Sequence, residues 1–233
     1  MAAPFAGGWY LRGDIGFSNQ DVERLDSPGL VGGTPRQKGF DSAPFGGVGV
    51  GYKFNDWIRA DITGEYRGRA NLHASDSYVG GPGFFPGVNE YSGSKSEWVG
   101  LANVYFDLGT WNGFTPFVGG GVGFAHNTIH NFRDTNVPVL GVAFAPDHSE
   151  TNFAWAVHAG VSYAITPNAS VEFAYRYINL GDARTGVITT YDATASFPPI
   201  RFRNIDSHDF KVGFRWMFAD MPAYDQAPLI RKY

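Results

Sequence analysis

The last patterned segment of the chain alternates large apolar residues with charged or small ones. The apolar set is Phe210, Val212, Phe214, Trp216 and Phe218, and it opposes Asp209, Lys211, Gly213 and Arg215. A period of two is that of a β-strand with two different faces. The pattern recurs in about eight segments, which predicts an all-β fold. We expect an eight-stranded antiparallel up-and-down transmembrane β-barrel with lipid outside and a polar lumen inside.

The eight expected strands cover residues 8–17, 45–54, 57–67, 97–108, 115–125, 152–165, 169–177 and 209–218. The third strand argues most clearly for a polar interior, because five successive inward positions between Arg59 and Arg67 are polar and cannot form a dry core. A soluble lipocalin-like barrel is the alternative fold. It would place these charges outside and line its lumen with Trp and Phe throughout, which disfavours it.

Connection lengths give a second signal. Short turns at residues 55–56, 109–113 and 166–168 alternate with four long loops at roughly 18–42, 68–95, 126–151 and 178–206. Three short periplasmic turns and four long external loops are typical of outer-membrane barrels. Residues 187–191 and 200–203 also alternate and could extend the last strands. We therefore expect a periplasmic N-terminal segment at 1–7, the barrel at 8–218 and a periplasmic C-terminal tail at 219–233.

Charge and composition exclude several classes of partner and of membrane segment. The net charge of -4 provides no basic surface, so we expect no nucleic-acid partner. No stretch approaches the roughly 18 continuous apolar residues of a membrane helix. The segment at Met1 lacks the basic and apolar regions of a signal peptide. We interpret the sequence as the mature form of a protein of the Gram-negative outer membrane.

Tryptophans give a check on the topology. In the predicted barrel all six fall near a membrane–water interface, where amphipathic rings are favoured. The expected interface aromatics are Trp9, Trp57, Trp98, Trp111, Trp155 and Trp216.

Four segments together resemble the outer-membrane β-barrel surface antigens of alphaproteobacteria, relatives of the opacity-protein and OmpA-like eight-stranded barrels. They are GWYLRGDIG at 8–16, TPFVGGGVGF at 115–124, VEFAYRY at 171–177 and FKVGFRWMF at 210–218. The resemblance implies insertion by the barrel-assembly machinery. It makes Phe218 the candidate assembly signal, although fifteen residues follow it. It also implies attachment to peptidoglycan through the N-terminus, around Ala2. A separate hypothesis is that the C-terminal tail contacts peptidoglycan or another periplasmic partner, the alternative being a tail that is disordered or lies on the barrel mouth.

The expected lumen carries charges of both signs in near balance. On the predicted register the inward charges are Arg12, Asp14, Lys53, Arg59, Asp61, Glu65, Arg67, Asp107, Glu172, Arg176, Asp209, Lys211 and Arg215. A barrel of eight strands is only wide enough for its side chains to fill it. We therefore predict a lumen largely plugged by ion pairs, with a narrow pathway for small solutes or ions as the alternative.

Other constellations are weaker. His126, His130 and His148 share the third loop without tight ligand spacing, so we expect no metal site and no cofactor. His158 and Ser162 share the lumen face with Glu172 nearby, but a relay needs hydrogen-bond reach and an accessible nucleophile. We predict that the chain is not an enzyme.

The predicted function is therefore a structural and surface-display barrel that supports membrane integrity and presents loops for interaction. Its expected partners are outer-membrane lipids and lipopolysaccharide. A porin-like channel is the second hypothesis, and a lipid-modifying enzyme is the third.

Overall fold

The computed structural model describes residues 7–26, 34–79, 86–138 and 140–218, and within them it forms one antiparallel sheet. The strands are β1 (Gly8–Asp26), β2 (Thr34–Phe40), β3 (Ala43–Lys53), β4 (Ile58–Tyr78), β5 (Gly87–Asp107), β6 (Phe114–Asn136), β7 (Gly141–Ala145), β8 (His148–Ala164), β9 (Ala169–Asn179), β10 (Ala183–Arg184), β11 (Ile188–Thr190), β12 (Ser196–Phe197) and β13 (Arg201–Met217). The predicted all-β antiparallel class is confirmed. None of the described residues belongs to a helix long and apolar enough to cross a membrane.

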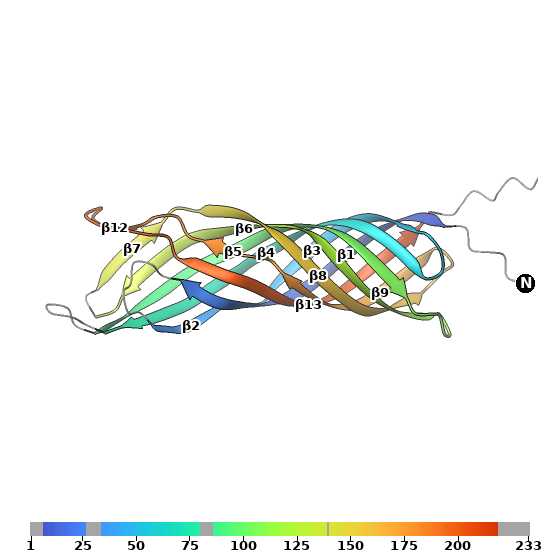
Figure 1. Ribbon diagram of the computed structural model, residues 1–233, viewed down its shortest axis with the longest axis horizontal. Coiled ribbons are helices and arrows are strands. Elements are labelled where there is room, and N and C mark those ends of the chain that lie inside the picture. Colours follow the sequence, from blue (N-terminus) through green and yellow to red (C-terminus); the bar gives the residue numbers. More distant parts are fainter. Residues whose placement is uncertain (1–6, 27–33, 80–85, 139, 219–233) are drawn as a thin grey trace, which may run out of the picture.

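The sheet closes on itself into a ring. Neighbouring strands pair in the order β6, β5, β4, β3, β1, β13, β9 and β8, and β8 returns to β6. β1 joins the first and last parts of the chain, because Leu11 pairs with Trp216 on one side and with Val50 on the other. Figure 1 shows the elongated barrel, with the N-terminal end of the described chain and the end of β13 at the same end.

Short turns connect strands at the end of the barrel where the described chain begins and ends. In the first turn the Asn55 side chain accepts hydrogen bonds from the backbone of Trp57 and Ile58, at 2.8 and 2.9 Å. In the second, Gly109 and Gly113 adopt positive φ angles of 113° and 85°, which glycine tolerates without strain. These local bonds and conformations close the hairpins within a few residues.

The predicted long loops are wrong over most of the described residues, which continue as strands. β1 runs to Asp26, β4 to Tyr78, and β5 and β6 cover Gly87–Asp107 and Phe114–Asn136. The residues 200–203 do extend the last strand, since β13 begins at Arg201, whereas β11 pairs with β7 and β12. These segments stay in the sheet because strand pairing continues to satisfy their backbone groups.

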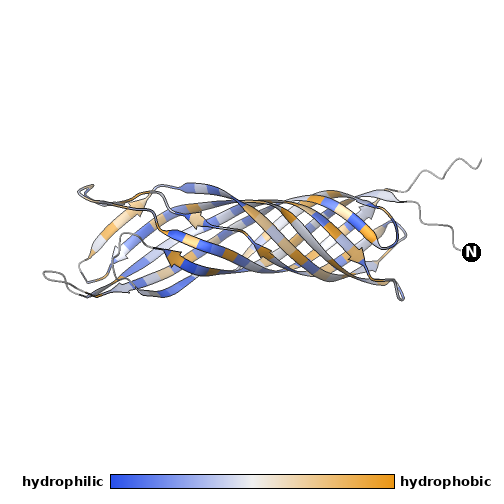
Figure 2. Cartoon of the chain, in the orientation of Figure 1, coloured by the Kyte–Doolittle hydropathy of each residue, from blue (hydrophilic) through white to orange (hydrophobic). Residues whose placement is uncertain are grey.

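The barrel has two halves with opposite polarity. We call the described residues within 8–17, 45–67, 97–125, 152–177 and 209–218 the turn half, and the described residues between them the extended half. In the turn half, Ile15 and Phe17 lie on the outer wall and are 69% and 66% exposed. In the extended half, apolar side chains such as Val22 and Phe202 are buried inside. Figure 2 shows apolar and polar residues alternating along the strands.

Candidate functional site: the lumen charge network

The lumen of the turn half contains the thirteen charged residues that the sequence pattern predicts to face inward. Of the thirteen, Lys53 is half-buried and the other twelve are buried. They project from β1, β3, β4, β5, β9 and β13, so the closed ring brings together residues far apart in the chain. They form two connected clusters, one nearer the short turns and one nearer the extended half.

The first cluster begins at Arg12 on β1. Its guanidinium donates to Asp14 at 2.8 Å and to Asp61 on β4 at 2.9 Å. The nitrogen that donates to Asp14, Nη2, also lies 3.2 Å from Glu172 on β9. One arginine therefore links three strands of the ring through charge-assisted hydrogen bonds, the stronger class of hydrogen bond in proteins.

Glu172 is the acceptor that most cations of this cluster share. Arg59 lies 3.2 Å from it and Arg215 lies 2.8 Å from it. Arg59 also donates to Asp107 at 3.1 Å, and Lys53 lies 3.9 Å from that same carboxylate. The remaining lysine of the cluster, Lys211, lies 3.7 Å from Asp14.

Arg67 and Arg176 organise the second cluster. Arg176 on β9 lies 2.6 Å from both Glu65 and Asp209. Arg67 on β4 lies 2.6 Å from Asp209 and 3.1 Å from Glu97. In the order of the ring β4 and β9 lie opposite each other, so the Arg176–Glu65 pair crosses the lumen.

Several members of the network were not selected from the sequence. Lys95 pairs with Glu97 on the same strand, and both side chains are buried. Tyr10 donates to Asp61 at 3.1 Å, and the Tyr105 hydroxyl accepts from Arg12 at 3.1 Å. The alternation of the sequence could have identified three of them. Lys95, Glu97 and Tyr105 lie an even number of positions from Asp107, so a regular strand places them on the same inward face.

The considered lumen relay does not form. His158 Nε2 lies 3.2 Å from the amide oxygen of Asn103, and Ser162 Oγ accepts from Arg215 at 3.3 Å. Glu172 is occupied by the arginines described above. The described residues therefore give His158 no hydrogen bond to Ser162 or Glu172. The same part of the chain contains no group of three or more His, Asp or Glu residues suited to hold a metal ion.

The six tryptophans are all exposed on the outer surface, by between 41% for Trp155 and 73% for Trp57. Phe218 is the last described residue, and its backbone nitrogen donates to the Trp9 carbonyl at 3.0 Å. The roles predicted for these aromatics in interface anchoring and assembly stay predictions. The predicted contact segments around Ala2 and at 219–233 lie outside the described residues.

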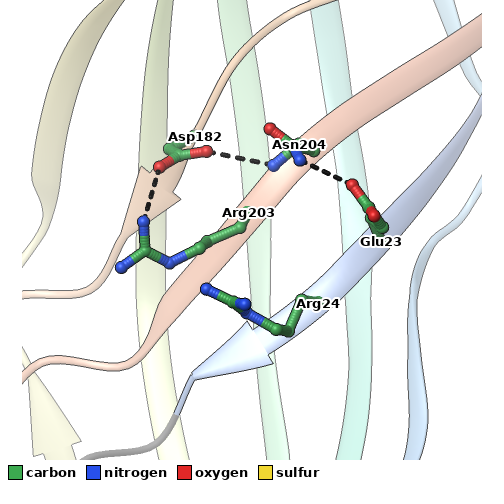
Figure 3. A pocket seen from close by; sticks show the side chains of 5 residues that line it. All are labelled: Glu23, Arg24, Asp182, Arg203 and Asn204. Carbon is green, nitrogen blue, oxygen red and sulfur yellow. Dashed lines mark hydrogen bonds and ion pairs between the residues drawn. The ribbon is translucent and has the colours of Figure 1, made fainter.

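A small pocket of about 200 Å³ lies in the extended half, lined by Glu23, Arg24, Asp182, Arg203 and Asn204 (Figure 3). Its polar groups are already paired: Asn204 donates to Glu23 at 2.5 Å, Arg203 lies 3.7 Å from Asp182, and Arg24 and Arg203 both pair with Asp26. The mixed signs leave no strong preference for a charged ligand. We therefore assign the pocket no ligand class.

A family model described as the outer membrane protein beta-barrel domain matches residues 1–218. The chain belongs to this family. Membership places the protein in the outer membrane of Gram-negative bacteria, as the sequence predicted.

Relatives in the family cover most of the chain. A protein of Brucella abortus (strain 2308) is 30% identical over 94% of this chain and 87% of its own length. A putative adhesin of Rickettsia prowazekii (strain Madrid E) is 28% identical over 89% of this chain and 86% of its own length. Among solved structures, the outer membrane protein OprG of Pseudomonas aeruginosa is similar with a TM-score of 0.54 and 15% identity, over 91% of this chain and 96% of OprG. That likeness shows the fold alone.

Proposed function

We propose that this protein is a closed outer-membrane barrel whose ring forms eight transmembrane strands and whose extended half displays a surface outside the cell. In this proposal the ion pairs close the lumen, and the protein supports membrane integrity and surface contact rather than solute transport.

The main support for a closed lumen comes from ion pairs that join opposite strands of the ring. Arg176 on β9 reaches Glu65 on β4, and Arg59 on β4 reaches Glu172 on β9, so two ion pairs cross the ring in opposite directions. Because such a barrel is filled by its own side chains, these bridges leave little room for a solute. Separating a buried pair would also leave charges without partners, at a cost of about 3–5 kcal/mol.

Strand length supports the display role. β5 and β6 are 21 and 23 residues long, whereas about 9–11 residues of a tilted strand cross a bilayer. The excess would carry the sheet roughly 25 Å beyond the membrane at ordinary strand rise and tilt. The Rickettsia prowazekii relative is named a putative adhesin, which supports contact with another surface as the purpose of this extension.

Single-channel recording tests the closed lumen. The full chain, refolded and checked by heat-modifiable migration, is expected to give a silent planar bilayer in which a known narrow pore is detected. The double variant Arg59→Gly/Arg176→Gly removes both crossing pairs and is expected to conduct. Regular openings from the unaltered chain would favour the channel hypothesis instead.

Cysteine labelling on intact cells tests the display. The chain contains no cysteine, so a single one can be placed at Asp21 in the extended half or at Asp56 in a short turn. A membrane-impermeant maleimide is expected to label Asp21→Cys on intact cells, and Asp56→Cys only after the outer membrane is permeabilised. The opposite pattern would reverse the proposed orientation.

A further inference from the structure

Three side chains on the outer face of the extended half form one continuous hydrogen-bonded chain. Ser96 is only 7% exposed, His130 is half-buried and Asp147 is exposed. Ser96 Oγ lies 2.9 Å from His130 Nε2, and His130 Nδ1 lies 2.7 Å from a carboxylate oxygen of Asp147. The residues come from β5, from β6 and from the connection between β7 and β8. A hydroxyl, an imidazole and a carboxylate at these separations meet the geometric requirement for an activated serine nucleophile.

The direction of the hydrogen bonds follows from their chemistry. An ionised carboxylate can only accept, so His130 Nδ1 carries a hydrogen and donates it to Asp147. In the neutral ring Nε2 is then the acceptor, and the Ser96 hydroxyl donates to it. The Asn131 backbone nitrogen donates to the other oxygen of Asp147 at 3.0 Å. The hydrogen bonds from His130 and Asn131 lower the pKa of Asp147, so it stays ionised.

A cation lies on β4, the strand next to Ser96. β4 and β5 shift register between Arg67 and Ala70, which leaves Gly68 and Arg69 together across from Ser96. The Arg69 side chain is exposed, and its charge acts on Asp147 and contributes to the lowered pKa of that residue. A positive charge at this position can stabilise the oxyanion that forms when a hydroxyl adds to a carbonyl group.

The position of Ser96 selects the class of substrate, and this step rests on the proposed membrane position of the ring. Trp98 points outward and packs against Tyr66, with ring centroids 4.9 Å apart, as expected of an aromatic pair at a membrane interface. Ser96 lies two residues further along β5 on the same face, which is about 7 Å along the strand. That level is where headgroups and their ester linkages to acyl chains lie.

We propose that Ser96 is the nucleophile of an ester hydrolase that acts on acyl esters of outer-leaflet lipids, with His130 as the base and Asp147 as a positioning residue. Ser96 Oγ adds to the acyl carbonyl carbon while its proton moves to His130 Nε2. The bond from that carbon to the lipid oxygen breaks, and the alcohol leaves with the proton. Water then hydrolyses the seryl ester, which releases a fatty acid and restores Ser96.

Neighbouring residues provide matched controls for a purely structural role. His126 Nδ1 lies 2.8 Å from Thr151 Oγ1, and Thr128 Oγ1 lies 2.9 Å from Ser149 Oγ, so both pairs join β6 to β8 on the same wall. Neither pair includes a carboxylate. If the Ser96 chain only ties strands together, Ser149→Ala and His126→Gln should affect the protein as much as Ser96→Ala and His130→Gln do.

The first test is covalent labelling by a fluorophosphonate of the full chain refolded in detergent. We expect labelling at Ser96, identified by peptide mass, with none in Ser96→Ala and at least a 100-fold slower reaction in His130→Gln. Ser149→Ala and His126→Gln should label like the unaltered chain, and all variants should keep heat-modifiable migration. An unaltered chain that does not label, or labelling that survives Ser96→Ala, overturns the assignment.

The second test uses vesicles of phosphatidylethanolamine and lipopolysaccharide and measures the fatty acid released. We expect release that Ser96→Ala abolishes, and an about tenfold slower release in Arg69→Met. Labelling at Ser96 without any release from these vesicles overturns the lipid substrate. Because the cysteine labelling described above reports orientation independently, a misplaced membrane boundary can be told from an inactive serine.

Asp147 is tested by the labelling rates of Asp147→Asn and of the conservative variant Asp147→Glu. The rate of Asp147→Asn should fall by about tenfold, because the amide no longer holds one orientation of the His130 ring, and Asp147→Glu should recover part of the rate. An Asp147→Asn variant that labels as fast as the unaltered chain contradicts the positioning role.

Discussion

A single strand, β1, passes through both halves of the barrel and shows how they differ. Between Trp9 and Phe17 its apolar side chains are exposed on the outer wall, while Arg12 is buried in the lumen. Beyond Ser18 the order reverses: Val22 and Leu25 are buried inside, and the outer wall is polar. The pairing with β13 continues through both regions without a break in direction.

The difference shows that the pairing of the backbone does not depend on the surrounding medium, whereas the polarity of the two faces of the strand does. Pairing satisfies the backbone everywhere, so the ladder can continue past the membrane. Where hydrocarbon surrounds a barrel, apolar side chains are favoured on its outer wall. Where water surrounds it, apolar side chains are favoured in its interior. We infer that the level at which polarity reverses marks the outer boundary of the membrane.

The largest effect is expected from breaking the turn half at Arg176. Arg176→Met removes one of the two arginines that Glu65 and Asp209 share and leaves Arg67 alone beside both buried carboxylates. The free energy of unfolding should therefore fall by about 3–5 kcal/mol. Urea titration of the barrel refolded in vesicles measures it. Arg201 is exposed on β13, and Arg201→Met should change the free energy by less than about 0.5 kcal/mol. Equal losses from both variants would contradict a role for the ion pairs in holding the turn half together.

A slightly smaller effect is expected in the extended half, where packing replaces ion pairing. The Phe202 side chain is fully buried and lies against Phe40, with ring centroids 5.7 Å apart. Phe202→Ala should cost about 3–4 kcal/mol through lost burial and the cavity left behind. Hydrogen exchange should show the loss in the extended half, with amide protection in the turn half retained. Uniform loss of protection would mean that the two halves unfold as one unit.

The sequence predicted the turn half because one strict alternation runs through its strands. The apolar set of residues 209–218 and the charges at Arg59 and Arg67 occupy the faces that period-two alternation assigns. The lumen positions and the strand ends at the short turns follow from that alternation, whereas the other ends of the strands do not. The partners of each charge do not follow, because they depend on which strands the closed ring places opposite each other.

The extended half was misread as loops for a physical reason. Irregular positions interrupt its alternation: register shifts occur after Arg67 and after Ser92, and Asn131 has a positive φ of 50°. Each such bulge changes which residues face inward, so a search for strict alternation ends there. The Ser96–His130–Asp147 chain was missed for the same reason, since it lies beside these irregularities.

Charged substitutions on the outer wall test the same contrast with a smaller effect. Ile62 and Asn71 both face outward on β4, in the turn half and the extended half respectively. Ile62→Lys should lower the free energy of unfolding by about 2–3 kcal/mol, because the lysine enters hydrocarbon. Asn71→Lys should be near neutral, since water surrounds it and Asp41, now bonded to Asn71, lies beside it. Similar costs at both positions would place the membrane boundary elsewhere.

The smallest expected effect is a pH dependence confined to the extended half. Burial raises the pKa of Asp134 to about 7, and the nearby Asp76 carboxylate adds to the rise. Because the folded state holds this proton more tightly than the unfolded chain, acid favours folding, and stability falls as pH rises from about 4 to about 7. The change should be on the order of 1 kcal/mol, since solvent screens a side chain that is not fully buried.

Hydrogen exchange at pH 5 and pH 8 measures this change. Amides near Asp134 on β6 should be better protected at pH 5 after correction for the intrinsic exchange rate, and Asp134→Asn should remove the difference. The control is Asp21→Asn, which removes an exposed carboxylate of β1 and should leave the pH difference in protection unchanged. A pH difference that survives Asp134→Asn would assign the proton to another group. A pH difference that extends into the turn half would show that the ion pairs of the turn half depend on packing in the extended half.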